Sequence, residues 1–397
     1  MASPPTTPGP EIPECSEDWR FEETGAPCEW VEEYRPGGLH PVSLGDTFCE
    51  GKYKVIRKLG AGCSSTIWLV ICEGNNLYSP PTYVALKITT AKSTITSTEL
   101  TVLDHLLAAA DDYPNSRHVT RLLDRFTHQG PNGIHQCLVF EVMDIESLDP
   151  QELKQDEAKT AVPVQRIDGK NDLWAPKNLY LKQSLHQHVQ LGQDICVKLS
   201  DFGAAFFTGN PPAKAITPIA LRAPELILNQ PFSSGIGTGI DMWSFGCLVY
   251  EFLTGSKLFT VMMFGFDQED VDGADDEHLL QLNDIIRPLP EAMMRAWPRS
   301  SVWYDAEHNL LQPDEAAVED SGGEEAAAER VGLDDGVDNG LPYIYDSLET
   351  RFAKKKHPDI DDEEAAVICQ LIREVLMYDP AERATAEQLL KHPWFLE

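Results

Sequence analysis

The sequence is poor in basic residues. It contains 32 Lys and Arg against 64 Asp and Glu, which gives a formal net charge of −32. Such a chain repels phosphate backbones and anionic lipid headgroups, so we expect no direct contact with nucleic acid or with a membrane surface. Two explanations of the acidity stay open: it suits a basic partner, or it only keeps the protein soluble.

Long apolar runs and paired cysteines are also missing. No run approaches the ~18 to 20 apolar residues of a membrane helix. The first residues, MASPPTTPGP, show neither the basic nor the apolar region of a signal peptide. The nine cysteines are scattered, without a CxxC pair or zinc-ligand spacing. Reduced thiols fit this pattern, and we expect a soluble intracellular protein.

The chain is long enough for two lobes. Residues 1 to about 50 are rich in Pro and Glu and are expected to be irregular. From Tyr53 onward YKVIRKLG, STIWLVICEG and TYVALKIT predict three strands separated by turns. An amphipathic helix over 96–110 and two further strands follow, HVTRLLDRFTH and HQCLVFEVM. This pattern predicts a small, mostly antiparallel sheet with one helix.

The second half of the chain favours helices. The segments 239–255, 363–379 and 385–395 are apolar or amphipathic at helical spacing. Two acidic stretches, 267–278 and 314–338, lie between the first of these helices and the other two. Charge runs are usually solvated, so both stretches are expected to be loops.

A glycine-rich turn and a lysine suggest a phosphate site. In LGAGCSST (59–66) the glycines Gly60 and Gly62 would let a backbone approach a phosphate closely. The following strand VALK ends in Lys87, which either lies at the surface or pairs with phosphates beneath the turn. Glu99 begins the next helix, either as a carboxylate near the helix dipole or as the ion-pair partner of Lys87.

Further along, VKLSDFGAAFF (197–207) places Asp201-Phe202-Gly203 after a short predicted strand and before RAPE (222–225). An aspartate in this context is expected to coordinate a magnesium ion that bridges phosphates.

Together these motifs resemble the eukaryotic protein kinases, and within them the SR-protein kinases in a fungal form. The resemblance runs from about 34 to 396 through YRPGGLHPVSLGD, LGAGCSSTIWL, VALK, LVFEVM, VQRIDGKNDLWAP, KLSDFGAAFF, TPIALRAPELIL, DMWSFGCLVYEFLTG and YDPAERATAEQLLKHPWF. It implies an α+β, bilobal protein-kinase-like fold with a small β-rich N-lobe and a mainly helical, incomplete C-lobe. The implied segments are an extension (1–50), the N-lobe and hinge (53–143), a spacer (144–196) and a C-lobe (197–396) with an acidic insert at about 260–350.

The resemblance implies ATP and Mg²⁺ as ligands. Lys87, Glu99 and Asp201 would be the catalytic residues, with Asp201 as the magnesium ligand. Phe140 would stand at the back of the adenine site. The implied ATP-binding set is Leu59, Gly60, Ala61, Gly62, Cys63, Ser64, Ser65, Thr66, Ile67, Ala85, Lys87, Glu141 and Met143.

The resemblance also implies structural roles and partners. Arg222 matches the branch that includes the SR kinases, Glu225 would pair with Arg383, and Asp241 would anchor the catalytic-loop backbone. The acidic stretch 267–278 resembles the region where these kinases dock basic Arg/Ser-rich splicing proteins. A monomer in the cytoplasm and nucleus, with a role in mRNA splicing, is expected.

One block of the kinase pattern is missing. A kinase carries a long apolar helix and an H-x-D-x-x-x-x-N loop between the hinge and Asp-Phe-Gly. Here Asp168, Asp172 and Asp194 are followed at the required offset by Leu173, Lys177 and Leu199, not by Asn. The sequence therefore leaves three explanations: a serine/threonine kinase of doubtful activity, a non-catalytic pseudokinase that binds ATP or basic partners, or the product of an incomplete gene model.

Overall fold

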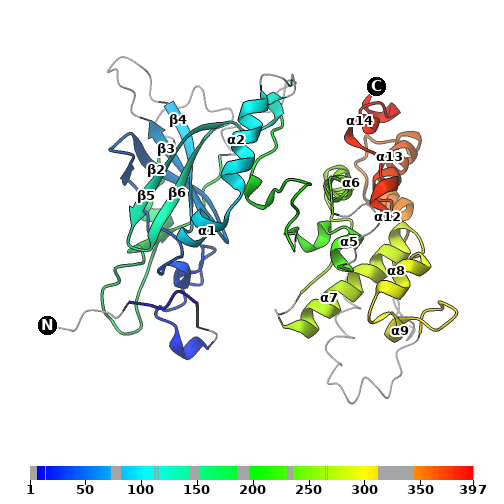
Figure 1. Ribbon diagram of the computed structural model, residues 1–397, viewed down its shortest axis with the longest axis horizontal. Helices are drawn as coiled ribbons and strands as arrows, with labels where there is room; N and C mark the ends of the chain where they lie inside the picture. Colours follow the sequence, from blue (N-terminus) through cyan, green and yellow to red (C-terminus); the bar gives the residue numbers. More distant parts are fainter. Residues whose placement is uncertain are drawn as a thin grey trace. The chain divides into compact units, whose positions relative to one another are not determined.

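We analysed a computed structural model that describes residues 7–13, 15–72, 82–110, 113, 116–142, 153–185, 196–213, 215–229, 236–263, 265, 267–311 and 344–396. The chain divides into two compact units, Met1–Ala205 and Phe206–Glu397 (Figure 1). The hinge residue Met143 and the acidic stretch 314–338 lie outside the described residues. Among the described residues, no helix is both long enough and apolar enough to cross a membrane.

The first unit is built on an antiparallel sheet of six strands in the order β1-β2-β3-β4-β6-β5. The strands are β1 Thr47–Phe48, β2 Tyr53–Gly62, β3 Ser65–Cys72, β4 Thr82–Thr89, β5 Leu122–Gly130 and β6 Gly133–Glu141. The helices α1 Ala91–Thr96 and α2 Glu99–Ala109 lie between β4 and β5 in the chain. Trp68, Val70 and Leu86 are among the buried residues of its core. The β-rich first lobe is thus confirmed, with two helices where one was expected.

The described part of the extension has little regular structure, yet it is packed. Its described part contains two short 3₁₀ helices, Ser16–Asp18 and Val31–Glu33. Phe21, Tyr34 and Leu39 are buried in one apolar cluster together with Leu179, which lies far along the chain. Apolar burial of this kind stabilises a segment even where its backbone is irregular.

The described part of the spacer has regular structure, and several of its residues are buried although others are exposed to solvent. It forms the helix α4 Glu157–Thr160 and a two-stranded sheet of β7 Ala161–Pro163 with β8 Asn178–Tyr180. Leu153 is fully buried against Ile56 and Leu69 of the main sheet. The spacer therefore belongs to the first unit, because its few apolar residues pack on that sheet.

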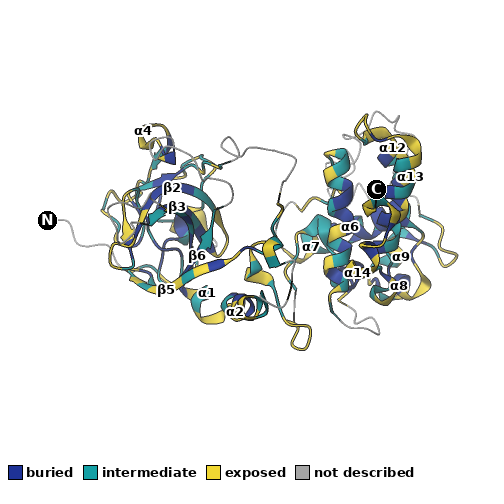
Figure 2. Ribbon diagram, turned by 90° about the horizontal axis from the view of Figure 1, so that it is seen from above, coloured by how far each residue is buried: buried dark blue, intermediate teal, exposed yellow. Residues whose placement is uncertain are grey.

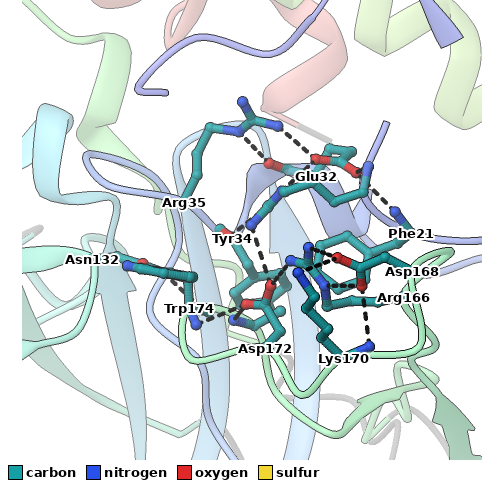
Figure 3. Close-up of polar contacts among 12 residues, drawn as sticks. Phe21, Glu32, Tyr34, Arg35, Asn132, Arg166, Asp168, Lys170, Asp172 and Trp174 are labelled. Atoms are coloured by element: carbon teal, nitrogen blue, oxygen red, sulfur yellow. Dashed lines mark hydrogen bonds and ion pairs between the residues drawn. The ribbon is translucent and has the colours of Figure 1, made fainter. Parts of the chain in front are cut away.

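Buried ion pairs join the extension to the spacer (Figure 3). Glu32 accepts hydrogen bonds from the guanidinium groups of Arg20 at 3.0 Å and Arg35 at 2.6 Å. Asp172 in the spacer accepts from Arg166 at 2.6 Å and from Arg20 at 3.5 Å. Because each buried charge has a partner, these acidic residues can be buried although the sequence pattern suggests solvent exposure.

The second unit is helical. Its longer helices are α6 Gly239–Thr254, α7 Gln268–Gln281, α12 Leu348–Lys355 and α13 Asp362–Val375, and its short helices are α5 Pro224–Ile227, α8 Glu291–Ala296, α9 Ser300–Trp303 and α14 Ala386–Leu389. Trp243 and Tyr250 of α6 pack with Phe352 and Ile372 in its core. The unit begins at Phe206, whereas the resemblance placed the boundary at 197. Leu199 forms a parallel bridge to Val119 of the first unit.

The stretch 267–278 lies in helix α7, so the predicted loop is wrong. Asp267 caps the helix by accepting a hydrogen bond from the Asp270 amide at 2.9 Å. Asp276 points inward and accepts from the indole nitrogens of Trp297 at 2.6 Å and Trp303 at 3.0 Å. The helix is stable because part of its acidity is neutralised or hydrogen-bonded internally.

Helix α6 combines a buried face with an apolar exposed face. In Figure 2 it carries both buried and exposed segments. Trp243 is fully buried, whereas Phe252 is 79% exposed and Phe245 is 37% exposed. An exposed large apolar pair at i, i+7 lies on one side of a helix and would suit a covering helix.

Candidate functional site

A glycine-containing hairpin joins β2 to β3. Gly62 pairs with Ser65 and Gly60 with Ile67, so Cys63 and Ser64 form a two-residue turn. A Cβ placed on Gly60 or Gly62 would have no heavy atom within 4 Å. The backbone of the hairpin is therefore accessible to a ligand, as a loop that approaches phosphates must be.

The strand register places four of the expected nucleotide-binding or adenine-flanking side chains on one face of the sheet. Ile67 is paired with Lys87. Ala85 is paired with Phe140 and follows Lys87 at an interval of two. Cross-strand partners and alternate residues share a face. Ile67, Ala85 and Phe140 are half-buried, which leaves apolar surface next to Lys87.

Lys87 lies between two carboxylates. Its Nζ is 2.7 Å from Glu99 Oε1 and 2.8 Å from Asp201 Oδ1. Lys87 and Glu99 are buried, whereas the Asp201 side chain is 77% exposed. A Cβ on Gly203 would make ordinary contacts, at 3.4 Å from Asp201 Oδ1 and 3.7 Å from Lys87 Nζ, so this glycine lies next to both charged groups. The predicted Lys87–Glu99 ion pair is present.

These contacts shift the pKa values of Lys87 and Asp201. Burial lowers the pKa of Lys87, but hydrogen bonds and charges from Asp201 and Glu99 outweigh it and raise the pKa overall. The hydrogen bond from Lys87 is the largest cause of the lowered pKa of Asp201. Near neutral pH the site therefore presents an ammonium group and an exposed carboxylate.

The residues fit a nucleotide with magnesium in part. An exposed, ionised Asp201 can coordinate a hard cation, and Lys87 can pair with phosphate oxygens. Asp201 has a left-handed backbone conformation with φ 63°, which is uncommon outside glycine and concentrates at functional sites. No group of three His, Cys, Asp or Glu side chains suited to a metal occurs among the described residues. Phosphate oxygens would have to complete the coordination.

In the second unit the expected structural pair is present. Arg383 donates to Glu225 through two parallel hydrogen bonds of 2.6 and 2.7 Å, and both side chains are almost fully buried. Arg383 also donates to the carbonyl of Gly239 at 2.8 Å and lies over the Trp243 ring at 5.1 Å. This pair ties helix α5 to the chain after α13.

Arg222 and Asp241 do not take part in the buried Glu225–Arg383 pair. Arg222 donates to the Thr217 carbonyl at 3.3 Å and lies 3.8 Å from Asp275. Asp241 is in the first turn of α6 and is exposed, and partial desolvation by the surrounding protein raises its pKa. Among the described residues no hydrogen bond to its carboxylate offsets this desolvation, and the catalytic loop that it would anchor is missing from the sequence.

The sequence interpretation missed the residues that support the hairpin from outside the kinase pattern. Glu29 forms a buried ion pair with Lys58, and Gln155 accepts a hydrogen bond from the Lys58 amide at 2.7 Å. Nothing in the local pattern marks these residues, because the partners are 29 and 97 positions apart.

The protein kinase domain family matches residues 172–395, more than half of the chain, and the chain therefore belongs to the protein kinase family. A crystal structure of a kinase domain aligns with a TM-score of 0.52 over 89% of this chain and 98% of its own, at 23% identity, which supports the fold alone.

Among the curated proteins that this chain resembles are SR-protein kinases. The serine/threonine-protein kinase SRPK of Physarum polycephalum is 25% identical over 93% of this chain and 91% of its own length. A serine/threonine protein kinase of Aspergillus fumigatus is 26% identical over 99% of this chain and 96% of its own length. The kinase SKY1 of Saccharomyces cerevisiae is 38% identical, over 29% of this chain and 16% of its own length.

Proposed function

We propose that this chain binds ATP with magnesium through the hairpin 59–66, Lys87 and Asp201. The observation that carries the proposal is the position of the Lys87 ammonium, 2.7 Å from Glu99 and 2.8 Å from the exposed carboxylate of Asp201. The half-buried Ile67 and Ala85 on the same face suit the adenine ring. Leu59, Ala61 and Glu141 would complete this set, and Thr66, whose side chain is buried on the opposite face, would contribute through its backbone.

We further propose that phosphoryl transfer by this chain is slow. In kinases an aspartate accepts the proton of the substrate hydroxyl, and an asparagine five residues later holds a second magnesium ion. The sequence between the hinge and Asp201 has no such pair. A positioned base contributes about 10²- to 10⁴-fold to a rate, and the lost magnesium ligand adds to that. The chain would then act mainly by binding.

The partner class that we propose is Arg/Ser-rich basic proteins. Four acidic side chains near the start of α7 are exposed or half-buried, namely Asp267, Glu269, Asp270 and Asp272. Strongly cationic peptides are steered by such clusters, and the net charge of −32 acts in the same direction. The similarity to a relative named SRPK supports this choice. We also propose a monomer in the cytoplasm and nucleus, compartments where thiols such as the nine free cysteines of this chain stay reduced.

A second candidate is that the locus also encodes a longer, catalytically complete serine/threonine kinase. The alignments with the Physarum and Aspergillus relatives run over 435 positions, more than the 397 residues of this chain, so the relatives contain residues that it lacks. The exposed Phe245 and Phe252 on α6 are a suitable surface for an additional helix. Transcript reads across codons 143–145 decide this: a direct join supports the short chain, and an inserted block supports the longer kinase.

Isothermal titration of the full chain with ATP and Mg²⁺ tests nucleotide binding. We expect saturable binding that Lys87→Met and Asp201→Asn weaken by about tenfold or more, because each loses a charged contact to phosphate or metal. Glu23→Gln, an exposed position in the extension, serves as the control and should bind normally. Binding unaffected by Lys87→Met would refute the proposed site.

A further inference from the structure

One residue of the first unit, Lys58, is fixed at its amide, its carbonyl and its side chain by the extension and the spacer. Its amide donates to Gln155 Oε1 at 2.7 Å. Its carbonyl accepts from the Gln183 amide at 2.9 Å. Its ammonium group pairs with Glu29 and lies 5.6 Å from the centre of the Trp68 ring. The extension and the spacer thus converge on a single residue of β2.

These contacts are buried and mutually supported. The side chains of Lys58 and Glu29 are only 2% and 6% exposed. Glu29 also accepts a hydrogen bond from the Tyr34 hydroxyl at 2.6 Å. Gln155 is fixed in turn, because its amide donates to the Ile56 carbonyl at 3.0 Å and its side chain to Leu181 at 2.8 Å. In a buried site, ion pairs and hydrogen bonds of this kind leave little freedom to the residue between them.

Lys58 stands at the base of the hairpin, immediately before Leu59 and Gly60. It is paired with Trp68, and its side chain therefore projects from the face opposite to Lys87. A cavity of about 460 Å³ separates the extension from the hairpin, and Glu29, Lys58 and Gly62 all contribute to its lining. The extension thus reaches the tip of the hairpin from its outer side, away from the proposed nucleotide.

We propose that Glu29 and Gln155 are positioning residues for nucleotide binding: by fixing Lys58 they pre-order the glycine hairpin that covers ATP. The proposal rests on the proposed function of the same hairpin. Gly60 and Gly62 have many backbone conformations available, and ordering them costs entropy when a ligand binds. Fixing Lys58 at the foot of the hairpin lowers that entropy cost. The extension and the spacer therefore raise the affinity for ATP without contacting it.

The test compares variants of the full chain by titration with ATP and Mg²⁺ at a temperature where melting curves show each to be folded. Glu29→Gln removes the charge partner, and Gln155→Ala removes the amide acceptor without any change of charge. We expect each to weaken affinity about 5-fold or more, the lower end of usual couplings between sites. Glu32→Gln breaks the two buried ion pairs that Glu32 forms with Arg20 and Arg35, neither of which involves Lys58, and should leave affinity within twofold.

Hydrogen exchange gives a second readout that a purely structural role would not change. Because coupling is reciprocal, ATP should slow exchange of residues 27–34 in the natural chain and not in Glu29→Gln. Normal affinity in both Glu29→Gln and Gln155→Ala, with Lys87→Met impaired, would overturn the inference and leave the proposed function standing. An equal loss of ATP affinity in Glu32→Gln and Glu29→Gln would also overturn the inference. If the natural chain itself binds no ATP, the proposed function and this inference both fail.

Discussion

Replacing Arg383 by Ala should destabilise the second unit strongly. The side chains of Arg383 and Glu225 are 1% and 2% exposed, so the substitution leaves a carboxylate buried without its partner. Breaking a buried pair in this way costs about 3–5 kcal/mol, a large fraction of the 5–15 kcal/mol typical of a domain. Arg383 also donates to the carbonyls of Met377, Tyr378 and Gly239, which would lose those bonds.

Urea unfolding followed by hydrogen exchange of the α6 peptide 239–254 measures this loss, since Trp243 of α6 lies beneath the guanidinium group. The double variant Glu225→Leu/Arg383→Met should recover most of the stability, because it buries no unpaired charge. A single variant that loses less than about 1 kcal/mol would refute the idea that this buried pair is a main support of the unit.

Three further predictions concern stability. Phe252→Gln should change the free energy of unfolding by less than about 0.5 kcal/mol while it lowers binding of an apolar dye, because the ring is 79% exposed. Burial lowers the pKa of His40 to about 3, whereas its pKa in the unfolded chain is near 6.5. The first unit should therefore lose stability as the pH falls below about 6.5, by about 2 kcal/mol at pH 5. In urea titrations His40→Phe should remove this part of the pH dependence. Asp276→Ala should lower the melting temperature more than Asp270→Ala, since only Asp276 accepts bonds from two buried or half-buried indoles.

The sequence predicted the parts of the site that depend on local spacing. Strand alternation and the turn residues placed Gly60, Gly62 and Lys87 in one hairpin-and-strand unit, and the structure has that arrangement. The pairs Lys87–Glu99 and Glu225–Arg383 followed from the resemblance, because a family motif carries the contact as well as the residue types.

The packed extension and spacer could not be predicted in the same way. Glu32 and Asp172 look like solvent-exposed charges in the sequence, and only partners far away in the chain explain their burial. The spacer supplies few apolar residues, such as Leu153, and these pack on a sheet formed by distant segments. Likewise the charge run of α7 suggested a loop, because the internal role of Asp276 depends on tryptophans that follow it by 21 and 27 positions.

The measurement that tests the account most directly is transfer of radiolabelled phosphate from ATP to an Arg/Ser-repeat peptide by the purified full chain. Under conditions where titration shows that ATP is bound, we predict transfer at least about 10²-fold slower than by a complete kinase, because the catalytic Asp and Asn are missing. Transfer at the rate of a complete kinase that Lys87→Met abolishes would contradict the account, since the chain would then supply a catalytic base that its sequence does not show.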